Sequence, residues 1–268
     1  MKRLAVIAIL SIICSIAGAQ TAHWITADDP TCNERNVWIE FRKDFDLKKK
    51  VKKAETRIAA DSKYWLYVNG QCVVFEGGLK RGPIPNDTYY DIVDLAPYLR
   101  KGKNEVKFLL WYFGKSGFSH KSSGQSGMIF DSPSIGLVSD SSWLSQRLDA
   151  YRTAGKPTVN YRLSEANILY DARLEGQDGY KPSVELGEWG CKPWNNLILR
   201  PIPQWKDYGV KPLEYTVSND GEGNTILTAR LPYNAQMTPV IDLDAAEEGV
   251  LVKMETDHIM GGSEPCVR

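Results

Sequence analysis

Alternating apolar and polar positions between residues 54 and 112 predict antiparallel β-structure. In the segment 64–68, Trp65 and Tyr67 fall on one face of a strand and the other three side chains on the opposite face. Asn69-Gly70 follows, and this dipeptide is favoured in type I′ turns because both central residues need a positive φ. The sequence therefore predicts a β-hairpin, and the aromatic residues on both faces predict that its sheet is one half of a sandwich.

Further strands are predicted on both sides of this hairpin. They are expected at residues 23–25, 37–45, 104–112 and 134–138. Between residues 92 and 99, Pro97 predicts a short turn that crosses one end of the sheet. The stretch from Gly114 to Gly127 is rich in glycine and serine and has no periodicity, so it predicts a long surface loop.

The pattern becomes irregular from about residue 144, and predicts an extension packed on the first sandwich. Residues 201–212 predict a connector, and alternation resumes at residues 215–217, 225–231 and 238–243. Only about fifty residues follow this restart, whereas a complete sandwich needs about 100. The predicted fold class is therefore all-β, with a jelly-roll-like β-sandwich over residues 20–205 and an incomplete second β-sandwich over residues 206–268.

Residues 1–19 predict a secretory signal peptide. Lys2-Arg3 precede an apolar core over residues 4–16, and Ala17-Gly18-Ala19 form the small-residue site at which such peptides are cleaved. The apolar core is shorter than the roughly 20 residues that span a bilayer. We therefore expect a secreted or periplasmic protein, cleaved near Ala19, without a membrane span.

The net charge and the cysteine content of the chain bear on three questions: nucleic-acid binding, disulfide bonds and metal sites. The chain has 33 basic and 33 acidic residues, and loss of Lys2-Arg3 leaves a charge near −2, which gives no long-range attraction for nucleic acid. Four cysteines remain after cleavage, and they can form up to two disulfides in three connectivities or stay unpaired: Cys32, Cys72, Cys191 and Cys266. Because no cluster of cysteine and histidine occurs, no metal site and no cofactor is predicted.

The motifs of common catalytic sites are missing from the sequence. Neither a zinc-binding H-E-x-x-H nor a nucleophile elbow G-x-S-x-G is present. The histidines His23, His120 and His258 are scattered, and we expect surface positions without acidic partners. Asp242 and Asp244 are two positions apart in a predicted strand, so both side chains are expected on its solvent-facing side. We therefore do not expect them to form the pair of carboxyl groups that cleaves a glycosidic bond. The sequence predicts no catalytic residue.

Aromatic residues on the predicted β-scaffold suggest carbohydrate binding. A sugar offers an apolar C–H face that stacks on an aromatic ring, while its hydroxyls bind amides, carboxylates or arginine. The candidate residues are Trp65, Tyr67, Trp111, Tyr112, Phe118 and His120. For each of them, packing in the core or between domains is the alternative.

Several motifs occur in a distinctive order along the chain. They are Trp24-Ile25, the segments 41–45 and 54–70, Tyr90-Asp91-Ile92, the segment 139–143, and Leu169-Tyr170-Asp171-Ala172-Arg173. In this order they resemble the N-terminal region of bacterial α-L-rhamnosidases of glycoside hydrolase family 78. The resemblance spans most of the chain after the signal peptide.

This resemblance implies a secreted enzyme in which β-sandwich accessory domains precede a helical barrel that hydrolyses terminal L-rhamnose. No residue of this sequence corresponds to the barrel, so no catalytic carboxylate is carried over. We therefore expect a truncated, non-catalytic accessory region that binds carbohydrate weakly, with rhamnose-containing glycans or a missing catalytic domain as partners. The alternatives are a free-standing secreted lectin-like protein and a glycosidase that uses acids of its own.

Overall fold

The computed structural model describes residues 21–79, 86–118, 120–154, 164–176, 179–206, 208–230 and 240. The predicted signal peptide lies outside these residues, as does the predicted strand at 238–243 apart from Val240. The chain divides into two compact units, Met1–Gln204 and Trp205–Arg268.

One sheet of the first unit has six strands, which all pair in antiparallel fashion. In spatial order they are β13 (Lys181–Pro182), β10 (Leu144–Arg147), β2 (Val37–Leu47), β7 (Gly102–Tyr112), β4 (Lys63–Val68) and β5 (Gln71–Gly78). Between β4 and β5, Asn69 and Gly70 have φ angles of 51° and 79°. The predicted hairpin with two left-handed turn residues is therefore confirmed.

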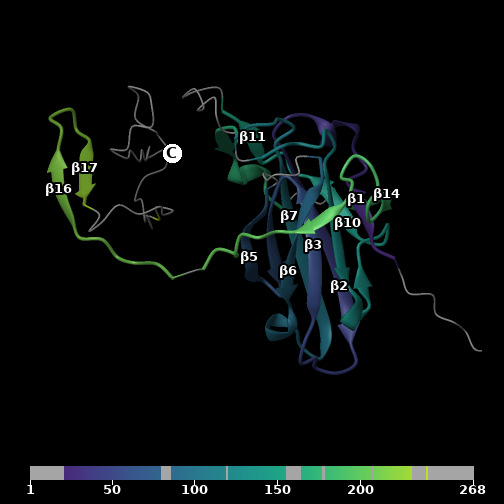
Figure 1. Cartoon of the computed structure of the whole chain (residues 1–268). Helices are drawn as coiled ribbons and strands as arrows, with labels where there is room; N and C mark the ends of the chain where they lie inside the picture. Colours follow the sequence, from purple (N-terminus) through teal and green to yellow (C-terminus); the bar gives the residue numbers. More distant parts are fainter. Residues whose placement is uncertain are drawn as a thin grey trace, which may run out of the picture. The chain divides into compact units, whose positions relative to one another are not determined.

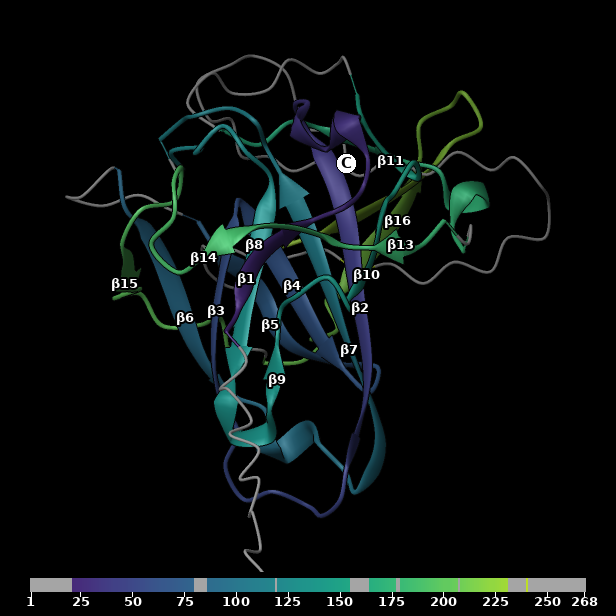
Figure 2. The ribbon, with the colours of Figure 1, turned by 90° about the vertical axis from the view of Figure 1, so that its right-hand side faces the viewer.

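The second sheet has seven strands. Along its path lie β14 (Val184–Glu188), β1 (His23–Thr26), β8 (Gly127–Ser132), β3 (Glu55–Asp61), β6 (Thr88–Asp94) and β15 (Leu197–Leu199), and β9 (Leu137–Val138) pairs with β8. Its pairs are antiparallel except that β15 runs parallel to β6. Figure 1 and Figure 2 show the strands of both sheets within the first unit.

The two sheets pack face to face around a common core. Alternate residues of β2, β4 and β7 point inward, and Phe41, Leu66 and Phe108 are fully buried. They share one cluster with Ile58 of β3 and Phe130 of β8 from the opposite sheet. The predicted all-β sandwich is confirmed, since apolar faces of two sheets bury one another.

Short 3₁₀ helices and a small strand pair connect these strands. The helices are η1 (Pro30–Asn33), η2 (Ala96–Tyr98), η3 (Pro133–Ile135) and η4 (Ala172–Leu174), and β11 (Tyr151–Thr153) pairs with β12 (Ile168–Tyr170). The predicted turn around Pro97 is present as η2.

The strand predicted at residues 134–138 is wrong in most of its length. Residues 133–135 form η3, and Gly136 ends this helix with a left-handed φ of 65°. The sheet instead receives β8 just before this point, and all six β8 residues are buried. A strand buried on both faces shows no alternation, so its pattern did not reveal it.

The extension predicted after residue 144 contributes to both sheets instead of only packing on them. It supplies β10 and β13 to the six-stranded sheet, and β14 and β15 to the other sheet. No disulfide joins the three cysteines of the described residues, Cys32, Cys72 and Cys191.

In the second unit, the described residues form a hairpin of β16 (Tyr215–Asn219) and β17 (Thr225–Ala229) (Figure 1). Both strands were predicted, and all of their residues are exposed. Within the described part of the chain, no helix has the length and apolar character required to cross a membrane.

Candidate functional site

The two sheets differ in what their outward sides expose. On the seven-stranded sheet, Trp194 stacks on Trp24 with ring centroids 4.1 Å apart, and both rings are fully buried. The segment that follows β14 therefore covers this side. On the six-stranded sheet, by contrast, Trp65 and Tyr67 are only half-buried.

We call the outward side of the six-stranded sheet the aromatic face. It consists of Trp38, Glu40 and Arg42 of β2, Lys107, Leu109 and Trp111 of β7, Lys63, Trp65 and Tyr67 of β4, and Leu144 and Gln146 of β10. These positions alternate with the core residues of the same strands, so their side chains share one face.

Strand register places polar groups level with the exposed rings. One row across the sheet runs Gln146, Glu40, Leu109 and Trp65, and the next runs Leu144, Arg42, Lys107 and Tyr67. Directly opposed residues of neighbouring antiparallel strands lie about 5 Å apart. Lys107 is therefore directly beside Tyr67, whereas Glu40 and Arg42 lie two strands from the exposed rings and Gln146 lies three strands from Trp65.

A stack of indole rings forms the floor of the aromatic face. The Trp38 ring lies 4.7 Å from that of Trp111, 5.3 Å from that of Trp65 and 4.3 Å from that of Tyr151, all nearly parallel. Trp38 and Trp111 are 3% and 5% exposed, so these two rings support the face from within. Phe75 of β5 meets Trp65 edge-on at 6.4 Å and is 47% exposed.

The polar side chains of the aromatic face are held in place. Glu40 accepts a hydrogen bond from the Tyr180 hydroxyl, and Gln146 Oε1 accepts one from the Gly179 amide at 2.9 Å. Arg42 Nε lies 2.8 Å from a Glu105 carboxylate oxygen. Fixed polar groups beside flat rings are suited to binding a rigid, hydroxylated ring.

The tyrosines on and beside this face remain protonated at neutral pH. Burial is the main cause that raises the pKa of Tyr67, with smaller effects of Cys72 and Glu40. Burial likewise raises the pKa of Tyr151. A hydrogen bond to Glu175 raises the pKa of Tyr170 to about 12. These phenols therefore act as neutral hydroxyls.

The structure brings three of the six sequence-predicted residues together. Trp65 and Tyr67 lie half-buried on the aromatic face, and Trp111 of the same face is connected to Trp65 through the ring of Trp38. Tyr112 and His120 are each 1% exposed, and Phe118 is 58% exposed in the loop that follows β7. Whether any of them touches a sugar stays a prediction.

The expectation for the histidines is wrong. His120 is buried, with its Nε2 atom 2.8 Å from Asp61 Oδ1. His23 is half-buried and lies within 4 Å of two carboxylates of β14, those of Glu185 and Glu188. These acidic partners are distant in sequence, so the pattern did not reveal them. His258 lies outside the described residues.

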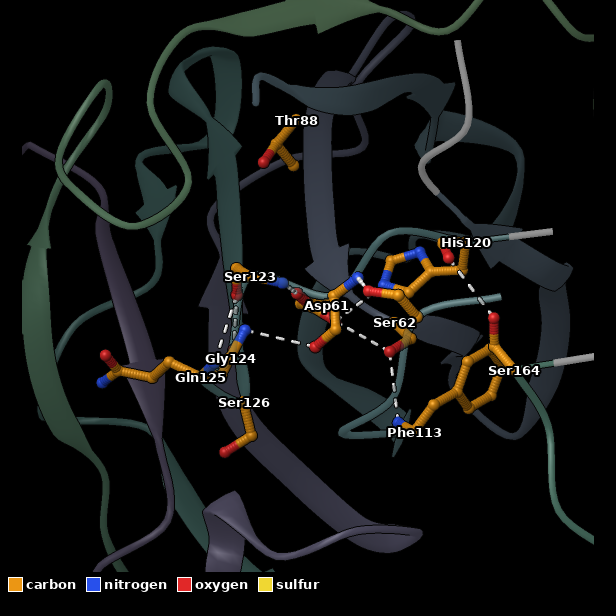
Figure 3. Close-up of polar contacts among 12 residues, drawn as sticks. Asp61, Ser62, Thr88, Phe113, His120, Ser123, Gly124, Gln125, Ser126 and Ser164 are labelled. Atoms are coloured by element: carbon orange, nitrogen blue, oxygen red, sulfur yellow. Dashed lines mark hydrogen bonds and ion pairs between the residues drawn. The ribbon is translucent and has the colours of Figure 1, made fainter. Parts of the chain in front are cut away.

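Asp61, at the end of β3, organises a buried polar cluster (Figure 3). Its Oδ1 atom accepts a hydrogen bond from Ser62 Oγ at 2.7 Å and contacts His120, while Oδ2 accepts one from the Ser123 amide at 2.5 Å. Burial by itself raises the pKa of Asp61, but the hydrogen bonds from His120 and Ser123 outweigh it and hold the pKa below 3.8. The carboxylate is therefore ionised at neutral pH.

This cluster has the residue types of a serine hydrolase without the geometry. In such an enzyme the imidazole lies between the carboxylate and the nucleophilic hydroxyl. Here Ser62 binds the Asp61 carboxylate directly, on the same oxygen as His120. The arrangement fits a structural anchor. Nor is any group of three or more histidine, cysteine, aspartate or glutamate side chains in the described ranges placed to hold a metal ion.

Most of the polar residues of the aromatic face were not predicted from the sequence. Glu40 alternates with core residues in a predicted strand, which was a usable signal for its outward position. Gln146 and Tyr151 lie in the stretch that the pattern marked as irregular, and their approach to β2 depends on strand pairing.

No family model and no curated protein matches the sequence. Solved structures do match. The chain is similar to the family 78 rhamnosidase of Bacillus sp. GL1, with 28% identity and a TM-score of 0.56, over 70% of this chain and 20% of that chain. It also has the fold of part of an α-L-rhamnosidase from Aspergillus terreus, with 21% identity and a TM-score of 0.52, over 77% of this chain and 25% of that one.

These comparisons confirm the resemblance that the motif order predicted. They also show that the chain spans between a fifth and a quarter of the length of the two rhamnosidases.

Proposed function

We propose that this chain is a secreted, non-catalytic carbohydrate-binding β-sandwich related to the accessory region of family 78 α-L-rhamnosidases. The aromatic face is the observation that carries the proposal. It combines half-buried rings, Trp65 and Tyr67, with polar groups in the same rows of the sheet, of which Lys107 is on the adjacent strand and the others are on β2 and β10.

The ligand we propose is a rhamnose-containing oligosaccharide. Rhamnose carries a methyl group in place of a hydroxymethyl group, so it offers more apolar surface to an aromatic ring than most hexoses do. Trp65 and Tyr67 are two positions apart on β4, and residues so spaced lie about 7 Å apart along a strand. This spacing allows two neighbouring sugar rings to stack at once.

The non-catalytic part of the proposal rests on the state of the carboxylates near the rings. A glycosidase needs two carboxyl groups on opposite sides of the scissile bond, each available to substrate or water. On the aromatic face, Glu40 accepts a hydrogen bond from Tyr180, and neighbouring Glu105 is paired with Arg42. We therefore expect binding without turnover.

Titration calorimetry on the full chain tests the binding. We expect a saturable isotherm with a rhamnose-containing oligosaccharide at millimolar concentration, and at least a tenfold loss of affinity in Trp65→Ala and Tyr67→Ala. Tyr208→Ala is the matched control, because Tyr208 is an aromatic residue that is 72% exposed in the second unit. The absence of heat, or an equal loss in all three variants, would contradict the proposal.

A turnover assay tests the second half of the proposal. We expect no release of rhamnose from an aryl rhamnoside by the purified chain. Release that disappears on substitution of one of its own acids would refute a non-catalytic role.

Export is tested by the mature N-terminus. Since residues 1–19 have the parts of a signal peptide, we expect the exported protein to begin at Gln20. An intact Met1 in the purified extracellular protein would contradict export by this route.

A further inference from the structure

The loop after β7 is connected to the end of β3 through one carboxylate. Asp61 Oδ2 accepts the Ser123 amide hydrogen bond at 2.5 Å, and Oδ1 lies 2.8 Å from His120 Nε2. Asp61 is 2% exposed and His120 is 1% exposed. Hydrogen bonds to a buried charge are stronger than those between neutral groups, so this carboxylate fixes both ends of the segment 120–123.

Asp61 also fixes Phe113 by two routes that both begin at Oδ1 (Figure 3). The Ser62 hydroxyl, which donates to Oδ1, accepts the Phe113 amide hydrogen bond at 3.2 Å. The His120 ring packs edge-on against the Phe113 ring, with centroids 5.7 Å apart. The amide and the ring of Phe113 are therefore each connected to one carboxylate oxygen, while the Phe113 carbonyl accepts a separate hydrogen bond from the Asn36 amide at 3.2 Å.

Phe113 in turn supports the floor of the aromatic face. Its ring meets Trp111 edge-on at 4.9 Å, and Trp111 stacks on Trp38 at 4.7 Å. Trp38 stacks on the half-buried Trp65 at 5.3 Å. A continuous series of ring contacts thus connects the buried pair to the ring that we propose binds sugar.

Other contacts hold Trp111 from different directions. Its Nε1 atom donates to Asn36 Oδ1 at 2.6 Å, and the Lys63 ammonium lies 5.7 Å from the centre of its ring. Neither of these two contacts involves Phe113.

From this geometry we propose that Asp61 and His120 are positioning residues for the aromatic face. The pair holds Phe113, and through it sets the tilt and spacing of the rings of Trp111, Trp38 and Trp65. The inference rests on the proposed function for its consequence in binding, whereas its consequence for ring geometry can be measured without any ligand.

A second buried aspartate provides a matched control. Asp91 is 4% exposed, its Oδ1 atom lies 2.5 Å from Arg200 Nε, and its Oδ2 atom accepts hydrogen bonds from the Tyr64 hydroxyl and the Gly78 amide. Asp61 and Asp91 thus each bind one cationic or imidazole side chain, one hydroxyl and one amide. None of these three partners of Asp91 is part of the indole stack.

The experiment compares Asp61→Asn with Asp91→Asn in the full chain. Near-ultraviolet circular dichroism without ligand reports the coupled indole rings, and calorimetry with the rhamnose-containing oligosaccharide reports binding. We expect Asp61→Asn to reduce the indole signal and to weaken binding about tenfold. We expect Asp91→Asn to leave both unchanged, although it also lowers the melting temperature.

His120→Gln and His120→Ala provide a second pair in case Asp61→Asn does not fold. Glutamine retains a hydrogen-bond donor for Asp61 but lacks the ring that packs on Phe113, so His120→Gln should keep part of the indole signal, whereas His120→Ala should lose more of it. Equal effects of Asp61→Asn and Asp91→Asn, or of the two His120 variants, would overturn the positioning role. An indole signal that responds to Asp61→Asn alone, in a chain that binds no glycan, would support positioning and refute the proposed function.

Discussion

At the scale of single residues, the position of an aromatic ring in the sheet determines whether the ring supports its neighbours from within or is exposed to solvent. Trp38 and Trp65 both point to the outward side of the six-stranded sheet. Trp38 is 3% exposed because Tyr151, Trp111 and Trp65 surround it, whereas Trp65 keeps part of its ring in solvent. Only a ring of the second kind can stack on a ligand without prior rearrangement.

The lowered pKa of the Asp61 carboxyl should make the free energy of unfolding depend on pH below about pH 4. Its pKa in the folded chain lies below the ordinary value of 3.8, so the unfolded chain takes up the proton first as the pH falls. The stabilisation is therefore complete well above pH 4 and is lost as the pH falls below that value. In urea unfolding between pH 2 and 5, Asp61→Asn should reduce the slope of stability against pH by up to about 1.4 kcal/mol per pH unit. Identical slopes for the two proteins would contradict this.

The sequence predicted residues of the aromatic face where local alternation governs orientation. Trp65 and Tyr67 were placed on one face of β4 because a strand has a period of two. The contact of His120 with Asp61 was not predictable, since 59 positions separate the two residues and a loop without periodicity carries the histidine. Contacts of this kind depend on how the loop returns to the sheet.

At the scale of elements, the sequence predicted the turn of the hairpin correctly but did not predict several of the strands. The hairpin at Asn69-Gly70 was predicted from two residues, because few dipeptides tolerate two successive positive φ angles. β8 was missed because its six residues are all buried, and β14 and β15 were missed because they are short edge strands within an irregular stretch.

Two glycines of this hairpin, one in the turn and one in β5, should differ in the cost of an added methyl group. Gly70 has a φ of 79° and open space around it, so Gly70→Ala should cost only backbone strain, about 1 kcal/mol. A Cβ atom at Gly77 would lie 2.4 Å from the Tyr64 ring, and Tyr64 is fully buried. Overpacking of this kind should make Gly77→Ala the more destabilising change, by about 3 kcal/mol. Urea unfolding measures both, and a larger cost at Gly70 would contradict the packing described for β5.

At the scale of the whole molecule, the chain divides into two compact units, and we expect the first unit to fold without the second. Among the described residues, the last strand of either sheet ends at Leu199, and Arg200 binds the buried Asp91. A chain that ends at Gln204 should therefore unfold cooperatively, with a melting temperature within about 4 °C of that of the same transition in the full chain, equivalent to no more than about 2 kcal/mol. Loss of cooperative unfolding in the shortened chain would show that the first unit requires residues beyond this boundary.

The hairpin of the second unit shows a limit of what the alternation of apolar and polar residues predicts. The hairpin of β16 and β17 was predicted from alternation, yet the side chains of Tyr215, Val217 and Leu227 are about half exposed or more. Alternation indicates that a strand has an apolar side, but it does not indicate which surface covers that side. A two-stranded hairpin alone has little stability in water.

The most direct test of the central claim is a nuclear magnetic resonance titration that locates the ligand. With the full chain and a rhamnose-containing oligosaccharide, we predict saturable shifts of the Trp65 indole resonance and of the backbone amides of Lys107 and Gln146, which share the aromatic face. Residues on the opposite sheet, such as Trp24 of β1, should not respond. Saturable shifts confined to any other surface, or no shifts at millimolar ligand, would contradict carbohydrate binding by the aromatic face.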